Sequence, residues 1–153
     1  VHGCLTLGSE SVKDRNIVLR NIKVGNAQRV LWLKMRPDTP QHYEYVTVDN
    51  ITGTTGSFLV VRPWTQFFKP GDRKDMPLSQ CNNITIKNIQ MDCDNFFDVG
   101  TSDKYRLVDF TFENIQSTDK KRAFNKDVIE NTIVKNVNIT PREKSNSISS
   151  IDG

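Results

Sequence analysis

The nine residues 83–91, NITIKNIQM, decide the fold because four other stretches repeat their pattern. These stretches are NIVLRNIKV at 16–24, YVTVDNITG at 45–53, DFTFENIQS at 109–117 and NTIVKNVNI at 131–139. All five align on one asparagine, which follows a charged residue and precedes Ile or Val. The aligned asparagines are Asn21, Asn50, Asn88, Asn114 and Asn136. Agreement at this level of detail indicates a structural repeat.

The pattern of apolar residues changes at the aligned asparagine. Before it, apolar side chains occupy alternate positions, with Thr132 as the one exception, as expected for a strand with one buried face. After it the apolar positions shift by one residue, which would turn every side chain of a continuous strand to the other face. Each asparagine is therefore predicted at a corner between two strands. Asparagine tolerates the left-handed backbone region, and stacked corners would let the amides hydrogen-bond to one another.

The spacing of the repeats predicts the fold. Successive asparagines are 29, 38, 26 and 22 residues apart, which fits coils of about three short strands at ~5 residues each. We therefore expect an all-β chain, a right-handed parallel β-helix, which is a single-stranded solenoid with Ile, Val, Leu and Phe stacked inside. The coils are expected over residues 1–140, and the polar residues 141–153 are expected to form a loose tail.

The two longest coils locate two predicted insertions. They cover residues 35–43 and 62–80, which contain two and three prolines, residues that discourage a regular strand ladder. Long loops on a rigid solenoid often gather on one face and shape a binding cleft. The alternative is that they cover the side of the solenoid.

Composition excludes several classes of protein. The chain has 153 residues, enough for one domain, with 21 basic and 18 acidic residues and a net charge of +3. So small an excess does not indicate a nucleic-acid-binding protein, but it is compatible with an acidic substrate held by a few placed cations. The sequence has no run of eighteen apolar residues, so no membrane-spanning helix is expected.

The cysteines point to packing rather than to a metal or a disulfide framework. Cys4, Cys81 and Cys93 are odd in number and form no CxxC pair. We expect buried free thiols, and a Cys81–Cys93 bridge remains the alternative.

Two short motifs carry a family resemblance. Val-His-Gly at residues 1–3 and Leu-Trp-Leu-Lys at residues 31–34 resemble the Gly-His-Gly and Arg-Ile-Lys motifs of glycoside hydrolase family 28, the polygalacturonases and related pectin-degrading enzymes. The resemblance covers the whole chain as the C-terminal part of such an enzyme, with the pectin-lyase-like β-helix. Residues 31–48 are particularly similar to the bacterial branch. Val1 and Trp32 depart from the motifs, standing in place of a glycine and an arginine.

The resemblance implies a reaction and roles for three residues. The reaction is hydrolysis with inversion at galacturonic acid, without a metal or other cofactor. His2 would be a catalytic residue that assists the acid group, and Lys34 would bind the substrate carboxylate. Arg36 lies two residues beyond Lys34, on the same face of an extended strand, and would supply the cation that Trp32 lacks.

The acidic residues that hydrolysis needs are missing from the sequence. An inverting glycosidase uses one carboxylic acid and one carboxylate, and the family takes them from Asn-Thr-Asp and Asp-Asp motifs that precede Gly-His-Gly. Neither motif occurs here, so the chain alone is expected to be inactive. The alternatives are a non-catalytic β-helix module that binds acidic polysaccharide and, third, a polysaccharide lyase.

Other residues have weaker claims to a site. Arg62 and Trp64 together suit a sugar carboxylate and ring, so we count both as substrate-binding candidates. His42 is expected to be a loop residue. The aspartates at 92, 94 and 98 offer oxygen ligands, but their irregular spacing favours a turn, at 92 and 94, over a calcium site.

The expected partner is an acidic polysaccharide or oligogalacturonide, rather than nucleic acid or a membrane. The family context implies a secreted or periplasmic protein. The first coil is expected to expose an unpaired strand edge, which favours self-association.

Overall fold

The computed structural model describes residues 2–8, 10–36, 40–63, 78–120 and 124–141. Strands make up 82% of these residues and form one six-stranded parallel sheet in sequence order. The predicted all-β class is therefore confirmed. One turn of 3-10 helix, η1 (Lys126–Val128), precedes the last strand. The strands are β1 (Gly3–Leu7), β2 (Lys13–Met35), β3 (His42–Pro63), β4 (Ser79–Val99), β5 (Tyr105–Asp119) and β6 (Glu130–Pro141).

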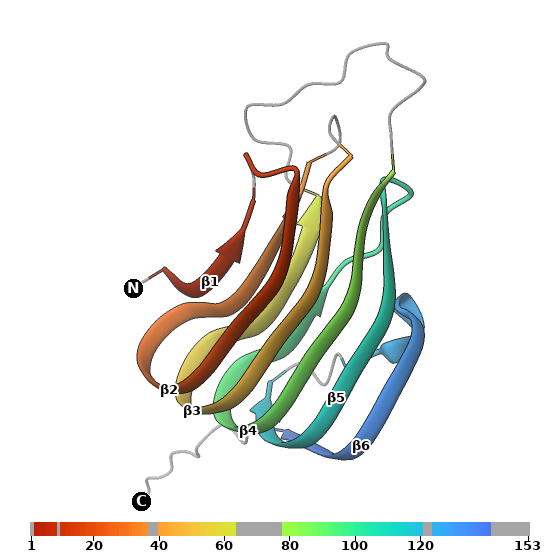
Figure 1. Cartoon of the computed structure of the whole chain (residues 1–153). Coiled ribbons are helices and arrows are strands. Elements are labelled where there is room, and N and C mark those ends of the chain that lie inside the picture. Colours follow the sequence, from red (N-terminus) through yellow and green to blue (C-terminus); the bar gives the residue numbers. More distant parts are fainter. Residues whose placement is uncertain (1, 9, 37–39, 64–77, 121–123, 142–153) are drawn as a thin grey trace, which may run out of the picture.

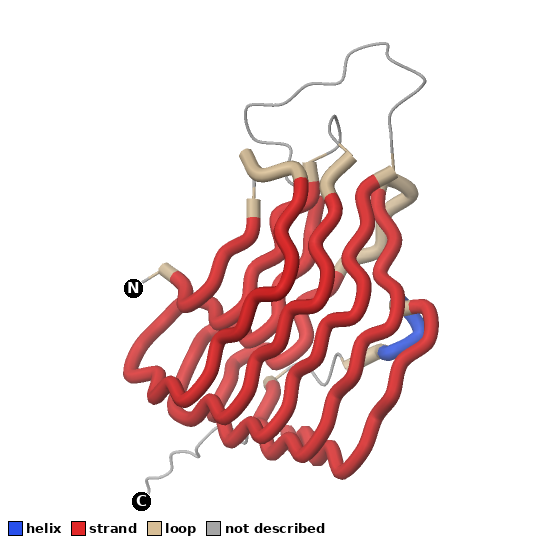
Figure 2. Tube along the Cα trace, viewed as in Figure 1, coloured by secondary structure: helices blue, strands red, loops and turns tan. Residues whose placement is uncertain are grey.

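The long strands bend at the repeat asparagines. All five have left-handed backbone angles, with φ between 53° and 60°, so the predicted corners are confirmed. Figures 1 and 2 show the strands running along the near side of the molecule, turning at the lower edge and returning along the far side. We call the residues before the corner the front limb (13–20, 42–49, 79–87, 105–113 and 130–135). The back limb is β1 with the residues after the corner (22–35, 51–63, 89–99, 115–119 and 137–141).

The strand register stacks equivalent repeat positions in rows. One row contains Leu19, Val48, Ile86, Phe112 and Val134. In the middle strands these side chains are fully buried, whereas Val134 on the last strand is 39% exposed. The two limbs meet in the core, because the rings of Phe97 on the back limb and Phe112 on the front limb lie 6.1 Å apart. Apolar residues therefore fill the space between the limbs, as the alternating pattern predicts.

The corner asparagines form a hydrogen-bonded ladder along the sheet. Asn50 donates from Nδ2 to Oδ1 of Asn21 at 2.8 Å. Asn114 donates in the same way to Asn88, and Asn136 to Asn114, each at 2.9 Å. These bonds satisfy side chains that stand at an exposed bend, and they confirm the predicted amide contacts.

A second left-handed column runs five residues before the first. It consists of Asn16, Tyr45, Asn83, Asp109 and Asn131, with φ between 55° and 61°. This bend was not predicted, although these residues open the five aligned stretches and four of them are Asn or Asp. Both columns interrupt the strand pairing at matching positions, so neighbouring strands bend together.

A row of charged residues precedes the corner. Their signs alternate along the sheet, so each inner member lies between residues of opposite charge. The row is Arg20, Asp49, Lys87, Glu113 and Lys135.

The predicted insertions coincide with connections between strands. β2 ends at Met35 and β3 begins at His42, while β3 ends at Pro63 and β4 begins at Ser79. The buried Gln41 joins these connections. It accepts from the Arg36 backbone N–H at 2.6 Å and donates from Nε2 to the Ser11 carbonyl at 3.0 Å, and its own backbone N–H donates to Ser79 Oγ at 3.1 Å. One glutamine thus fixes three strand ends.

The three thiols are free. Cys81 and Cys93 are buried and Cys4 is half-buried, in line with the expected packing role. Burial raises the pKa of both Cys4 and Cys81. The alternative of a Cys81–Cys93 bridge is not realised. The expectation that Asp92 and Asp94 lie in a turn is wrong, because both belong to β4. Their side chains point out of a strand whose alternate residues are buried.

Candidate functional site

A groove with a volume of about 390 Å³ lies on the back limb. It crosses β2, β3 and β4, where the row Thr6, Trp32, Val60 and Asp98 is in register. We call it the Trp32 groove. Its lining residues are Gln28, Arg29, Trp32, Ser57, Val60, Arg62, Pro63 and Asp98.

Strand alternation explains why polar residues reach this surface. Leu31, Leu33 and Met35 are buried, with exposures of 1% or less. Trp32 and Lys34, which lie between them, must therefore point to the outer face. Burial of these three apolar residues fixes the orientation of the strand, and this orientation determines the direction in which Trp32 and Lys34 point.

Two cations lie over the ring of Trp32. Arg29 Cζ is 3.9 Å from the ring centroid and Lys34 Nζ is 4.2 Å from it. Both distances are within the range of cation–π attraction. The indole therefore holds two positive charges on the outer face of β2.

Arg62 adds a third cation to this surface. It pairs in register with Lys34 on the adjacent strand, and neighbouring strands lie ~4.8 Å apart. Its guanidinium bonds to the Asp98 carboxylate, the single acidic group among the lining residues. Arg29 and Arg62 line the groove, and Lys34 lies over the ring of Trp32 beside it. Three cations thus stand against one carboxylate on this described surface, which suits an anion.

His2 and Lys34 stand at different places along the back limb. The exposed His2 lies beside Gln28, with 3.3 Å between His2 Nδ1 and Gln28 Oε1. Gly3 pairs with Arg29 and Leu7 with Leu33, so Lys34 is level with Gly8, six residues beyond His2. Six residues of extended chain span ~20 Å. The structure therefore places His2 just before β1 and Lys34 on the adjacent strand β2, but it does not bring the two residues together.

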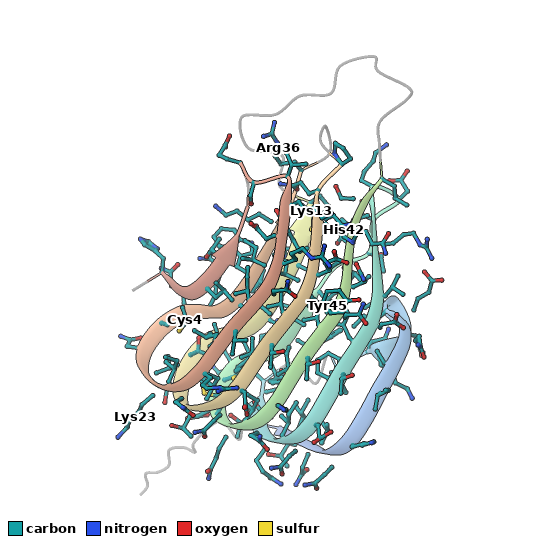
Figure 3. The ribbon with its side chains drawn as sticks, in the orientation of Figure 1. Cys4, Lys13, Lys23, Arg36, His42 and Tyr45 are labelled. Atoms are coloured by element: carbon teal, nitrogen blue, oxygen red, sulfur yellow. The ribbon has the colours of Figure 1, made fainter. Side chains whose placement is uncertain are left out.

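Arg36 holds a connection between strands. Its side chain is only 15% exposed, and Nη1 lies 3.7 Å from Glu10 Oε2. Figure 3 shows Arg36 at the upper end of the molecule, where the strands end. Trp64 lies outside the described residues, so its predicted role has no structural counterpart here.

His42 is not the loop residue that was predicted, because it is the first residue of β3. On the front limb (Figure 3), its Nε2 lies 2.6 Å from Asn82 Oδ1 and 3.5 Å from Glu44 Oε2. Glu44 also pairs with Arg15 Nε at 3.3 Å. The alternation of polar His42 and Glu44 with Tyr43 and Tyr45 was the available sequence signal for a strand.

No three His, Cys, Asp or Glu side chains within the described ranges gather as metal ligands would. The three aspartates considered for calcium have separate partners. Asp92 accepts from Thr118 Oγ1 at 2.6 Å, Asp94 pairs with Lys120 at 3.2 Å and Asp98 pairs with Arg62. The same ranges contain no helix of the length and apolarity that a bilayer crossing requires.

Comparisons with models of protein families, with curated proteins and with solved structures found no match to this chain.

Proposed function

We propose that the chain forms coils of a right-handed parallel β-helix and binds an acidic polysaccharide in the Trp32 groove. The fold proposal is supported by consecutive parallel strands that bend at the same two columns. Connections between parallel strands of one sheet are right-handed in nearly all proteins. The single observation that carries the binding proposal is the set of three cations around Trp32, namely Arg29, Lys34 and Arg62.

The chemistry of the groove favours a carboxylate on a polymer. Lysine is a point charge, whereas arginine presents a planar fork that matches a carboxylate. Lys34 and Arg62 are adjacent in register and so are able to engage one carboxylate together. Trp32 acts as the positioning residue that holds Lys34 and Arg29. The groove is open and crosses three strands, which suits an extended chain of sugars.

Galacturonic acid is the proposed sugar because of the family resemblance. We propose that the chain is the C-terminal portion of a polygalacturonase-like glycoside hydrolase that cleaves pectin with inversion. Inversion needs two carboxyl groups about 6.5–9.5 Å apart, and the lining of the groove offers one, Asp98, bonded to Arg62. This chain would then supply the cations that bind substrate. The catalytic aspartates would precede His2 in the parent protein, which we propose to be secreted or periplasmic.

Binding is tested first. Polygalacturonate titrated into the chain is expected to bind, with an affinity that falls as salt rises. Lys34→Gln and Arg62→Gln are each expected to weaken binding roughly tenfold, about 1.4 kcal/mol. Lys13→Gln, a matched loss of charge on the front limb (Figure 3), is expected to leave it unchanged. Equal effects of all three substitutions would show that net charge alone drives binding.

Catalysis is tested separately. Release of reducing ends from polygalacturonate is measured for this chain and for the chain extended at its N-terminus. Activity of the extended form alone supports the hydrolase portion. Binding without activity in either form supports the second candidate, a non-catalytic module, which the three cations also favour. An unsaturated product that absorbs in the ultraviolet would identify a lyase instead.

A further inference from the structure

Tyr45 departs from the rule of the second left-handed column. The other four members are Asn or Asp, which tolerate positive φ because their short side chains hydrogen-bond locally. Tyr45 adopts φ of 55° with a bulky side chain, which is an unfavourable combination. The fold itself would be better served by asparagine at this position.

Packing does not explain the tyrosine. Its residue is 48% exposed, so much of the ring remains outside the core. Arg15 from β2 lies beside it, with Cζ 5.7 Å from the ring centroid, and Arg15 is itself bonded to Glu44. A strained residue that is also exposed points to a role in binding.

Tyr45 borders a groove of about 360 Å³ on the front limb. The groove extends from β3 across β4 and β5 to β6, on the opposite side of Tyr45 from β2. Its floor contains Thr47, Thr85 and Thr111, which are adjacent in the register. The remaining lining residues are Asn83, Asp109, Phe110, Asn131 and Ile133. Figure 3 shows Tyr45 on the outer surface of this limb.

The chemistry of this second groove differs from that of the Trp32 groove. Its described lining residues offer hydroxyl groups, amides and the ring of Tyr45, and none of them is a cation. Its one carboxylate, on Asp109, already accepts from Asn131 Nδ2. Four strands span ~14 Å, the length of a few sugar rings, at ~4.8 Å per spacing.

We propose that this groove binds neutral carbohydrate, with one sugar ring stacked on Tyr45. An aromatic ring offers an apolar face to the C–H groups of a sugar, while threonine and asparagine side chains serve its hydroxyl groups as donors and acceptors. A negatively charged sugar is disfavoured beside Asp109. The proposal does not depend on the function proposed for the Trp32 groove, which lies on the back limb.

The test uses Tyr45→Asn, which restores the residue type of the column. Neutral β-1,4-linked hexasaccharides of glucose, galactose and xylose are titrated into the whole chain by calorimetry. Tyr45→Asn is expected to raise the melting temperature and to weaken binding at least tenfold. Tyr45→Phe, which keeps the ring, is expected to bind within about threefold of the unchanged chain.

Three outcomes would overturn the proposal. The first is that none of the three hexasaccharides binds to the unchanged chain. The second is that Tyr45→Asn binds as well as the unchanged chain, and the third is that Tyr45→Phe loses binding equally. Lys34→Gln serves as the control for the Trp32 groove. It is expected to leave the affinity for the neutral hexasaccharides unchanged and to lower the affinity for polygalacturonate.

Discussion

Asn88 donates its side-chain N–H to Oδ1 of Asp49 at 2.8 Å, whereas Asn50, Asn114 and Asn136 each donate to a corner asparagine. Asp49 belongs to the charged row, one residue before Asn50. The ladder therefore shifts by one residue between β3 and β4, where the longest interval between repeats also falls. A charged acceptor strengthens the bond at this junction, so the ladder continues across the shift.

Asn114 has a ladder hydrogen bond on each side, since it donates to Asn88 and accepts from Asn136. Substitution at this position therefore tests how much the ladder stabilises the fold. Asn114→Ala is expected to lower the free energy of unfolding by about 2–3 kcal/mol, because it removes both bonds and leaves at positive φ a residue that lacks the local hydrogen bonding by which asparagine tolerates this conformation. Asn114→Gly keeps the backbone relaxed and is expected to cost about half as much. Chemical denaturation measures both, and equal losses would show that the backbone angle is unimportant.

Gly53 is predicted to be irreplaceable. A β-carbon there would stand 1.9 Å from the Val24 carbonyl oxygen, with φ at +125°. Gly53→Ala is expected to cost roughly 3 kcal/mol or more, or to prevent folding. Gly25 has no atom within 4 Å of a β-carbon, so Gly25→Ala is the matched control, with a change within about 0.5 kcal/mol. Equal melting temperatures for the two variants would contradict the clash expected between a β-carbon at position 53 and the Val24 backbone.

Asp98 is expected to limit binding of acidic sugars, because its carboxylate occupies Arg62. Asp98→Asn removes one negative charge from the Trp32 groove while keeping the shape of the side chain. The affinity for polygalacturonate is expected to rise about threefold at low salt, and the gain is expected to shrink as salt screens the charges. An unchanged affinity in the same titration would place the ligand away from Arg62.

Stability is expected to fall in alkaline solution. Burial raises the pKa of Tyr105 to about 12, and its hydroxyl donates to the Gly100 carbonyl. Tyrosine in the unfolded chain ionises near pH 10, so between about pH 10 and 12 the unfolded state holds fewer protons than the folded state. The free energy of unfolding therefore decreases with pH across this window and is unaffected by Tyr105 below it.

Tyr43 contributes in the same direction, because burial raises its pKa as well. Tyr105→Phe removes one of these groups and is expected to flatten the decline above pH 10, whatever its effect on stability at pH 8. Urea denaturation at several pH values measures the slope. A slope identical to that of the unchanged chain would rule out Tyr105 as a source of the pH dependence.

Self-association is expected to increase with salt. In the described residues, β1 pairs only with the back limb of β2, so the front limb of β2 has a free edge, as does β6. Two copies stacked in the repeat register would place Lys135 beside Arg20, and like charges on adjacent strands repel. Lys135→Glu is expected to promote association at low salt by several-fold, as measured by light scattering. Association that weakens with salt would contradict this arrangement.

The repeat made the corners and the core predictable, because the shift in apolar positions at Asn21 and its equivalents has one structural solution. The Trp32 groove was only half predictable. Lys34 and Arg62 were found from the motif and from residue type, but Arg29 and Asp98 belong to the groove through the strand register, which spacing alone does not supply. His42 was missed because the prolines near it suggested a loop.

The distance between the two left-handed columns is constant at five residues, whereas successive repeats are separated by 22 to 38. Apart from one extra residue between Val24 and Ala27 in β2, variation in length falls at the strand ends opposite the bend, as at residues 100–104 between β4 and β5. The bend is therefore the constant part of each repeat, and these connections are the sites at which extra residues can be inserted. A foreign peptide inserted at 101–103 would be displayed without altering the rows on either limb.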